Sequence, residues 1–567
     1  MHPQDPRIEA RRATEREPHR AFAWILLSDA ELDAGDAQAG RVAAERALIL
    51  APGHPEALAR LGRAHWMQGD LQAATANLRA ASRNAPQHPG IAVWLGHVLE
   101  DVGEAEAASE AYARAHALDP REPLVAAYLL AWRRRLCDWR DLEPLSGQVR
   151  DAVRHGQASV EPFAFLSEDS TPAEQLQCAR LRARAIASAI RTLPPAAMQA
   201  GGNIRIGFLS NGFGAHPTGL LVVAFLEALA AHSDIETHLF ALNEDDGSEI
   251  RQRLHAHTLH DVAQMPHGQV AATIRTTGIE LLFDLRGWGG GGTPEVLAMR
   301  PAPLQVNWLA YPGTSGAPWI DHVLADPFVL PLSLEPHFSE TVLRLPRCFQ
   351  PSDTTRTIAP PRSRADYGLP AQGVVYCCFN NSYKLNPASF ARAMQVLARV
   401  DNSVLWLLSG PGRSDDRLRD AARSAGIDPM RLVFMDKQPQ PEYLARLQLA
   451  DLFLDTNPYN AHTTASDALW AGCPVLTKPG DTFAARVAGS LNHHLGLDDM
   501  NVEDDAGYIE RAVALGRDPD RLHALRERLR EAKTTSGLFD MPAFANDFAA
   551  MARTLVDQRR RESPRTP

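Results

Sequence analysis

A repeat with a period of 34 residues most constrains what this chain can fold into. Glycines recur at Gly35, Gly69 and Gly103, and an acidic residue follows each of them. Four more columns keep the same spacing: Pro52, Pro86 and Pro120; Pro55, Pro89 and Pro123; Leu27, Leu61 and Leu95; Ala47, Ala81 and Ala115. A fixed period of this length indicates stacked units that bury a continuous core only together.

Each repeat is predicted to form two helices joined by a tight turn. The glycine and acidic pair supplies the turn, because glycine adopts the left-handed backbone most easily, and the prolines end one repeat and open the next. The pattern resembles the tetratricopeptide repeat, with about three full repeats in residues 19–122. We therefore expect an α-solenoid of tetratricopeptide repeats over residues 1–122 and a helical cap and linker over residues 123–200. The solenoid groove is a candidate surface for a protein or peptide, and the alternative is that so short an array only packs against the next domain.

From Asn203 onward, short apolar strands alternate with helical segments. Strands are expected at 204–210, 237–242, 278–285 and 304–310, and then at 374–380, 403–409, 431–435, 451–456 and 474–477. Such alternation predicts parallel sheets with crossover helices, that is, two Rossmann-like α/β lobes. The expected boundaries are an N-terminal lobe at 201–346, a connector at 347–370 and a C-terminal lobe at 371–567. Ligands of such sheets bind at the carboxyl ends of the strands, so the loops there should carry the chemistry.

Composition narrows the function classes. The net charge of −10 argues against a nucleic-acid binder with a basic surface. No apolar run approaches the roughly 18 residues that would cross a membrane, and the first residues lack the apolar core of a secretory signal. The six cysteines lack zinc-ligand spacing and are interpreted as reduced core thiols. The sequence therefore predicts a soluble, cytoplasmic protein with no nucleic-acid or membrane partner.

The loops of the second half carry the strongest candidates for anion binding. His462, Thr463 and Thr464 fall where a helix is expected to begin, and free N–H groups with the positive end of the helix dipole attract anions there. Ordinary capping by one of the threonines is the alternative. Asp467, about one turn further on, is a candidate to accept from a ribose hydroxyl. Lys384 follows another strand and either lies over a diphosphate as a point charge or is solvated.

In the first half, His216 lies between the first strand and its helix. It is a candidate general base or hydrogen-bond donor, and the alternative is a structural histidine. The segment 287–292 contains five glycines and Trp288, which suggests a mobile lid or close backbone approach to a substrate. It lacks the spacing of a dinucleotide-binding or P-loop motif.

Several longer segments resemble a known family. They are GFLSNGFGAHPTG at 207–219, MRPAPLQVNWLAYPGTSG at 299–316, VVYCCFNNSYKLNP at 374–387 and LADLFLDTNPYNAHTTASDALWAGCPVLT at 449–477. With the repeats before them, these segments closely resemble the O-linked N-acetylglucosamine (O-GlcNAc) transferases, especially the bacterial members. The resemblance implies a two-lobed glycosyltransferase of the GT-B type. Such an enzyme would move N-acetylglucosamine from UDP-GlcNAc to Ser or Thr hydroxyls of proteins, with inversion and with no metal or other cofactor.

The resemblance also implies roles for individual residues. Lys384 and His216 would be catalytic. The other implied contacts are His462, Thr463, Thr464 and Asn381 at the diphosphate, Asp467 at the ribose, Tyr443 and Arg446 at the uracil with the backbone near Gln438, and Leu309, Tyr311 and Pro312 around the sugar. Three positions depart from the animal enzymes: Tyr443 replaces a histidine, Gln440 a lysine and Asn381 a glutamine.

Two alternative functions remain open at this point. One is a scaffold whose repeats bind partners beside a non-catalytic UDP-binding module, and the other is a transferase that uses another sugar or acceptor. The complete diphosphate-binding set favours an active enzyme, because a decayed site should have lost Lys384 or the histidine–threonine run.

Overall fold

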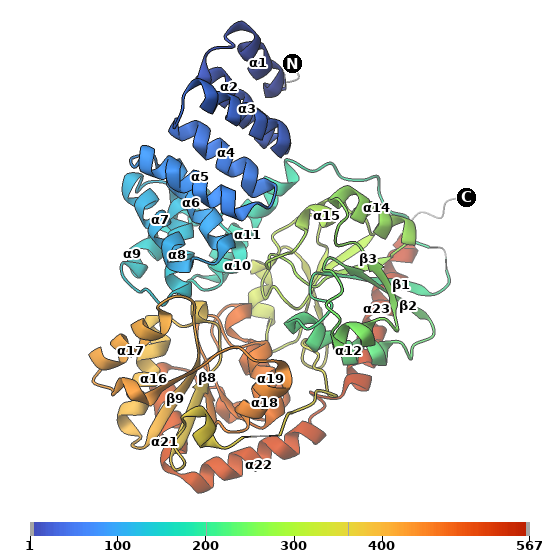
Figure 1. Ribbon diagram of the computed structural model, residues 1–567. Helices are drawn as coiled ribbons and strands as arrows, with labels where there is room; N and C mark the ends of the chain where they lie inside the picture. The colour runs from blue at the N-terminus through green and yellow to red at the C-terminus, as the bar shows by residue number, and fades with distance from the viewer. Residues whose placement is uncertain (1–4, 200, 361, 563–567) are drawn as a thin grey trace. The chain divides into compact units, whose positions relative to one another are not determined.

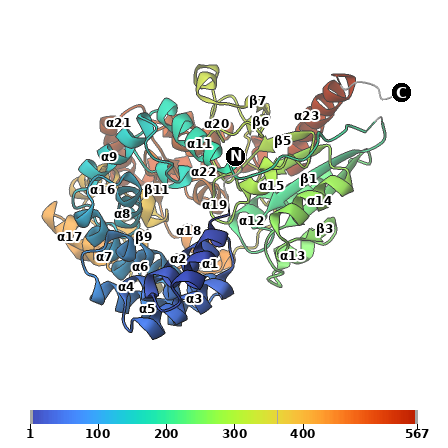
Figure 2. The ribbon, with the colours of Figure 1, turned by 90° about the horizontal axis from the view of Figure 1, so that it is seen from above.

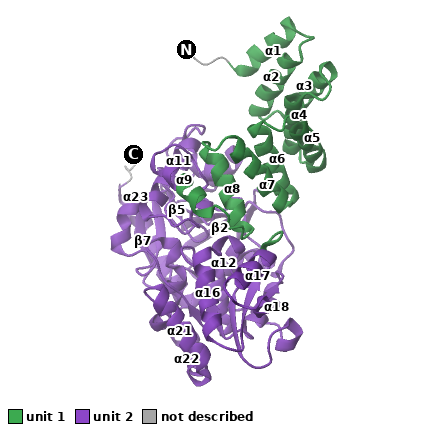
Figure 3. Ribbon diagram, turned by 90° about the vertical axis from the view of Figure 1, so that its left-hand side faces the viewer, with its two compact units in different colours: residues 1–149, 410–414 green, residues 150–409, 415–567 purple. Residues whose placement is uncertain are grey.

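The structure is a computed structural model that describes residues 5–199, 201–360 and 362–562. The chain divides into two units (Figure 3): residues 1–149 with 410–414, and residues 150–409 with 415–567. The unit boundary falls within helix α9 (Leu142–Arg154).

Paired helices build the first unit, as the repeat predicts. They are α1 (Pro6–Arg16), α2 (Ala21–Asp33), α3 (Ala37–Leu50), α4 (Pro55–Met67), α5 (Leu71–Asn84), α6 (Pro89–Val102), α7 (Ala105–Leu118) and α8 (Pro123–Arg135). The turn glycines Gly35, Gly69 and Gly103 have φ values of 86°, 80° and 83°, in the left-handed region that favours glycine. Asp36 and Asp70 then cap α3 and α5 by accepting from backbone N–H groups. The predicted repeat of helix, glycine turn and helix is confirmed.

Small residues let the two helices of a repeat approach closely. A Cβ atom at Gly62 would lie 2.7 Å from Cγ of Leu78, and one at Gly96 would lie 2.6 Å from the ring of Tyr112. These distances are too short for a side chain larger than hydrogen, so the repeat needs glycine at these two positions of α4 and α6.

The second unit contains two parallel sheets. The first lobe consists of β1 (Ile204–Ser210), α12 (Pro217–Leu229), β2 (Ile235–Ala241), α13 (Glu249–Leu254), β3 (Thr258–Asp261), α14 (His267–Thr277), β4 (Leu281–Asp284), α15 (Pro294–Ala298), β5 (Leu304–Asn307), β6 (His322–Ala325) and β7 (Thr341–Arg344). Its strands are ordered β3-β2-β1-β4-β5-β6-β7, and Ile206 on β1 pairs with Leu281 on β4. Figure 2 shows α12, α13 and α14 beside β1 and β3. Strands β3, β6 and β7 were not predicted. Strands β3 and β7 are half-exposed, so they lack the continuous apolar run that marks β4 and β5.

The second lobe has the order β10-β9-β8-β11-β12. Its strands are β8 (Val374–Cys378), β9 (Ser403–Leu408), β10 (Leu432–Met435), β11 (Leu452–Leu454) and β12 (Val475–Leu476), and the helices near them are α16 (Pro387–Arg399), α17 (Ser414–Ser424), α18 (Gln440–Leu447), α19 (Thr463–Ala471), α20 (Val487–His494), α21 (Asp505–Arg517) and α22 (Pro519–Thr535). The five strands match the predicted segments within a few residues. The predicted fold class, a helical solenoid followed by two α/β lobes, is confirmed.

Each of the two sheets has one point at which its strand order reverses. In the first sheet, β2 and β4 lie on opposite sides of β1, and in the second sheet β9 and β11 lie on opposite sides of β8. The loops that follow the two strands at such a point diverge and leave a crevice, which is where open parallel sheets bind ligands. The loops after β1, β4, β8 and β11 are therefore the expected places for a site.

The last helix, α23 (Met541–Glu562), packs on the first lobe, beside α12 (Figure 1). The ring centroid of Phe548 lies 4.8 Å from that of Phe225, and Arg553 forms an ion pair with Asp234 at 2.6 Å. The predicted second lobe, 371–567, includes this helix. The apolar face of α23 indicates that the helix is buried but does not indicate its neighbour. The sequence pattern therefore does not predict that α23 packs on the first lobe.

Two properties of the described chain complete the fold. No helix in it is both long and apolar enough to cross a membrane. All six cysteines are buried, as expected for core thiols.

Candidate active site

A cavity of about 280 Å³ collects loops from both lobes of the second unit. Seven predicted site residues line it: His216, Leu309, Asn381, Lys384, His462, Thr463 and Thr464. The lining also includes Arg286, Tyr383 and Tyr459. Among the described residues that line it, the basic side chains are Arg286, Lys384 and the two histidines, and there is no Asp or Glu. The cavity therefore suits an anionic ligand.

Lys384 ends a short 3-10 turn directly after β8. Its Nζ donates to the carbonyl oxygen of Asn460 at 2.7 Å and lies 3.8 Å from the ring centroid of Tyr459. Burial lowers the pKa of Lys384 to about 7, although the nearby charge of Asp455 opposes the shift. Within the described part of the chain, no carboxylate lies within ion-pair distance of Nζ. A bound anion would supply the missing counter-charge.

Helix α19 begins in the cavity without a side-chain cap. His462 occupies the cap position, and Thr463 and Thr464 are the first two helical residues, so neither threonine caps the helix. The Thr464 hydroxyl donates instead to Oδ1 of Asn380 at 2.7 Å. The structure thus excludes the capping alternative and leaves the helix N-terminus available to an anion.

The His462 side chain contributes less to this anion site than the family resemblance implies. Its Nε2 lies 3.1 Å from the carbonyl oxygen of Ala484, and a carbonyl only accepts, so the proton is on Nε2. Burial and the charge of Lys384 hold the pKa of His462 well below its usual value, so the imidazole is neutral. Its only ring proton points to Ala484, so the backbone and the threonines are the hydrogen-bond donors that this corner offers to an anion.

Asp455 shapes the loop that precedes α19. Its Oδ1 accepts from the backbone N–H groups of Thr456 at 2.7 Å and Ala461 at 2.6 Å, and its Oδ2 accepts from the hydroxyl of Thr477 at 2.6 Å. Its role cannot be read from the sequence pattern, because its contacts form only when the loop folds back over the end of β11.

His216 caps helix α12 on the other side of the cavity. Its Nδ1 accepts from the backbone N–H of Thr218 at 3.2 Å, so in the neutral ring the proton lies on Nε2. Burial, and then the charge of Arg286, lowers the pKa of His216 to about 4. At neutral pH the residue is therefore an uncharged hydrogen-bond donor, and it is a weak base.

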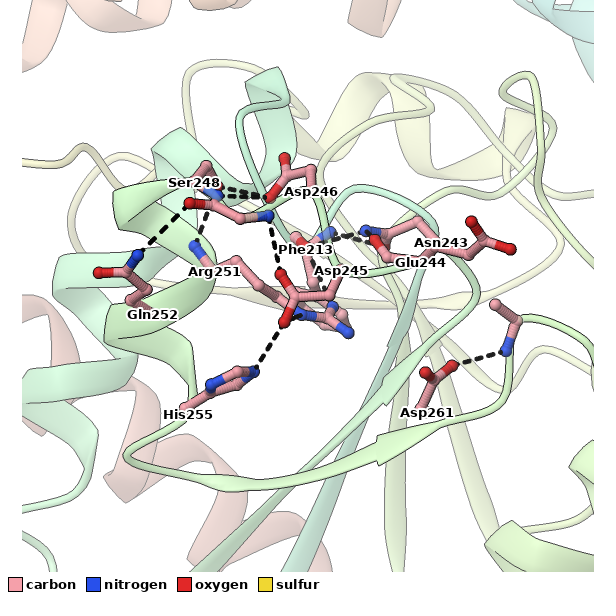
Figure 4. A network of polar contacts seen from close by, with 12 residues as sticks. Phe213, Asn243, Glu244, Asp245, Asp246, Ser248, Arg251, Gln252, His255 and Asp261 are labelled. Atoms are coloured by element: carbon pink, nitrogen blue, oxygen red, sulfur yellow. Dashed lines mark hydrogen bonds and ion pairs between the residues drawn. The ribbon is translucent and has the colours of Figure 1, made fainter.

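A polar network behind His216 holds its loop in place (Figure 4). The backbone of Phe213 exchanges two hydrogen bonds with the Asn243 side chain, at 3.1 and 2.9 Å, and its carbonyl also accepts from the buried Arg251 at 3.1 Å. Asp246 accepts from the backbone N–H of Ala215 at 2.7 Å. The loop after β2 and helix α13 thus position the loop after β1 before any ligand binds.

Asp467 lies in α19 but outside the cavity lining, and it is paired with Arg356. Both side chains are buried, and Nη1 of Arg356 donates to Oδ1 of Asp467. Two more hydrogen bonds fix the guanidinium, to the carbonyl of Asp353 and the hydroxyl of Ser352, both at 2.7 Å. Burial raises the pKa of Asp467 to about 6, and the charge of Arg356 opposes that shift. Arg356 lies in the predicted connector, to which the sequence analysis assigned no role.

The other predicted residues do not line this cavity. Tyr443 and Arg446 lie on α18, where the Tyr443 hydroxyl is buried with no hydrogen-bond partner among the described residues, and Arg446 lies over the ring of Tyr367 at 4.7 Å. Gln438 is exposed in the loop before that helix. These three residues stay predictions for a uracil site.

The two other residues predicted for a sugar pocket, Tyr311 and Pro312, are buried and do not line the cavity. Tyr311 is 3% exposed and belongs to the core of the first lobe, and Pro312 is buried beside it. The structure thus brings only Leu309 of the three to the cavity. Among the described residues no group of three or more His, Cys, Asp or Glu side chains is arranged to hold a metal ion.

Two Rossmann-like lobes with a ligand cavity at the reversal points of both sheets define the GT-B class of glycosyltransferases. Within that class the chain belongs to glycosyl transferase family 41, whose model matches residues 182–360 and 350–548. An O-GlcNAc transferase mutant from Thermobaculum terrenum has a similar solved structure, with a TM-score of 0.67 and 26% identity over 95% of this chain and 98% of that one.

Two curated relatives are named as glycosyltransferases acting on peptides. The chain is 35% identical to the probable UDP-N-acetylglucosamine–peptide N-acetylglucosaminyltransferase SEC of Arabidopsis thaliana over 71% of its own length. It is 28% identical to the UDP-N-acetylglucosamine–peptide N-acetylglucosaminyltransferase of Caenorhabditis elegans over 62% of its length. The chain spans 44% and 40% of these two relatives.

Proposed function

We propose that this protein is an enzyme that transfers N-acetylglucosamine from UDP-GlcNAc to Ser or Thr hydroxyls of proteins, with inversion at the anomeric carbon. The observation that carries the proposal is the cationic cavity in which Lys384 faces the uncapped start of α19. A sugar nucleotide has its negative charge at the diphosphate, and this cavity offers an ammonium and free N–H groups to it. The names of the curated relatives supply the sugar and the acceptor class.

The predicted residues contact different parts of the bound UDP-GlcNAc. In the proposal, Lys384, Thr463, Thr464 and the backbone at His462 bind the diphosphate, with Asn381 beside it. Asp467 binds the ribose, and its pairing with Arg356 keeps the carboxylate ionised as an acceptor for the hydroxyls. The uracil lies against Tyr443 and Arg446 and near the backbone of Gln438. The sugar lies against Leu309, and the buried Tyr311 and Pro312 support that wall of the cavity.

The reaction is a direct displacement. The acceptor oxygen forms a bond to the anomeric carbon while the bond from that carbon to the β-phosphate oxygen breaks, and UDP leaves with the electron pair. The charge that develops on the β-phosphate is stabilised by Lys384 and the helix dipole, which act best when they are fixed before the reaction. These groups supply positive charge at the leaving group, so the proposal includes no metal or other cofactor.

In this proposal the Nε2–H group of His216 donates a hydrogen bond to the bound UDP-GlcNAc or to the acceptor hydroxyl. Its Nδ1 is occupied by the N–H of Thr218, so taking a proton at Nε2 would first require a shift of the tautomer. In this proposal the hydroxyl proton of the acceptor therefore passes to a phosphate oxygen of the departing UDP.

The helical repeats are a second surface for the acceptor protein in this proposal. Trp66 on α4 and Trp94 on α6 are partly exposed, and their ring centroids lie 6.0 Å apart. Such aromatic pairs suit an extended peptide, because they offer a large contact area at a low cost in side-chain entropy.

The test is transfer by the purified full chain. UDP-GlcNAc, UDP-glucose and UDP-galactose are each incubated with a bacterial lysate, and modified peptides are mapped by mass spectrometry. The expected product is N-acetylhexosamine on Ser or Thr, lost in Lys384→Ala. UDP binding without transfer would support the scaffold alternative, and modification from another UDP-sugar or at another residue type would overturn the proposed donor or acceptor.

A further inference from the structure

Arg286 lies in the cavity on the first lobe and has no assigned role. It follows β4, so it stands at the reversal point of the first sheet, as Lys384 does for the second. Its backbone is fixed by the buried Asp284, whose Oδ1 accepts from the N–H groups of Arg286 at 2.9 Å and Gly287 at 3.0 Å.

The glycine-rich loop after Arg286 is held in place as well. The indole N–H of Trp288 donates to the carbonyl of Ser315 at 3.0 Å, and the N–H of Gly289 donates to the carbonyl of Arg286 at 2.9 Å. The side-chain amide of Asn211 donates to the carbonyl of Gly290 at 3.2 Å. These contacts connect the segment to the loops that follow β1 and β5.

The Arg286 side chain is incompletely satisfied. Its Nη2 donates to the carbonyl of Gly290, while its buried Nε has no hydrogen-bond partner in the described chain. It forms no ion pair with a carboxylate among the described residues. The nearby charge of Asp284 only partly opposes the lowering of the Arg286 pKa by burial. A half-buried guanidinium whose buried Nε–H has no acceptor and no anionic partner is costly unless a ligand supplies one.

The charge of a sugar nucleotide matches this arrangement. The bound diphosphate carries two negative charges, and a third develops when UDP leaves. Lys384 supplies one positive charge and the N-terminus of α19 about half of one. These two groups leave about half a negative charge unbalanced in the bound donor and about one and a half when UDP leaves. Arg286 is the other side chain with a full positive charge among the described residues that line the cavity.

We propose that Arg286 is a second diphosphate-binding residue, which contacts the β-phosphate from the first lobe while Lys384 contacts it from the second. This inference rests on the proposed function, since it assumes a UDP-sugar in the cavity. The planar guanidinium offers two parallel N–H donors to phosphate oxygens, which an ammonium does not. Arg286 thereby ties the leaving group to both lobes.

The test compares nucleotides that do and do not carry the β-phosphate. Dissociation constants of UDP and UMP are measured by calorimetry for the full-length protein and for Arg286→Met, Arg286→Lys and the surface control Arg423→Met. We expect Arg286→Met to weaken UDP by about ten- to a hundredfold and UMP by less than about twofold. Arg286→Lys should recover part of the loss, and Arg423→Met should bind as the unmodified protein does.

The possible failures are distinguishable. If the unmodified protein binds no UDP, the proposed function fails and this inference fails with it. If the unmodified protein binds UDP and Arg286→Met binds it equally well, or weakens UDP and UMP alike, only the role of Arg286 at the β-phosphate is overturned. A raised KM for the acceptor alone would place the residue at the acceptor instead. Unchanged circular dichroism and thermal unfolding of the variant show that the fold is intact.

Discussion

Donor binding should depend on pH through Lys384. In the free protein burial lowers the pKa of this ammonium to about 7, from its ordinary 10.5, and the titratable groups nearest to it are Asp455, Cys378 and His462. A diphosphate beside Nζ favours the charged form and raises the pKa back toward 10.5. The bound state holds the proton more tightly than the free protein does. The affinity for the sugar nucleotide therefore has its full value well below the pKa of Lys384 in the free protein, and it falls about tenfold per pH unit above that pKa.

The magnitude follows from those two pKa values. Between about pH 6.5 and about pH 8.5 the dissociation constant of UDP-GlcNAc should rise about 25-fold. Binding at about pH 8.5 should take up about one proton, and at about pH 6.5 about a quarter of one. The range stays above the pKa of Asp455, which burial raises to about 6, so this carboxylate remains mostly ionised throughout.

Isothermal titration calorimetry in buffers of different ionisation enthalpy measures both quantities. UDP-GlcNAc is the suitable ligand, because its diphosphate diester has no proton to lose in this range. Lys384→Arg is the matched control: a guanidinium stays charged, so its affinity should not vary with pH. Lys384→Met should bind weakly at every pH. A flat profile for the unmodified protein, or the same slope in Lys384→Arg, would refute the assignment of this titration to Lys384.

Two further predictions concern the ribose side and the repeats. Arg356→Met should raise the pKa of Asp467 further above its present value of about 6 and weaken uridine binding at neutral pH by about tenfold, measured by calorimetry; unchanged uridine affinity would contradict a role for the pair. Gly62→Ala should destabilise the first unit by about 1–3 kcal/mol in thermal unfolding, because its Cβ would lie 2.7 Å from Leu78. Gly147→Ala, where a Cβ atom meets nothing within 4 Å, is the control and should not destabilise; equal effects of the two substitutions would show that the close approach does not limit stability.

The sequence alone determined the parts of this protein that depend on neighbours along the chain. The 34-residue spacing of Gly35, Gly69 and Gly103 predicts the helical repeats, because each glycine turn and its acidic cap lie within one helix pair. Alternating apolar segments likewise predict the central strands of both lobes. Lys384 and the His462–Thr464 run could be found because each directly follows a strand or opens a helix, which is a local property.

The tertiary structure decided what depends on contacts between distant segments. Arg356 reaches Asp467 across 111 residues of chain, and α23 returns to α12 only because its apolar face fits the first lobe. Arg286 lines the cavity because β4 lies beside β1 in the sheet, and the strand order cannot be read from the strands themselves. Periodicity records which face of an element is buried, whereas the partner of that face, and so the composition of the cavity, is set by packing in three dimensions.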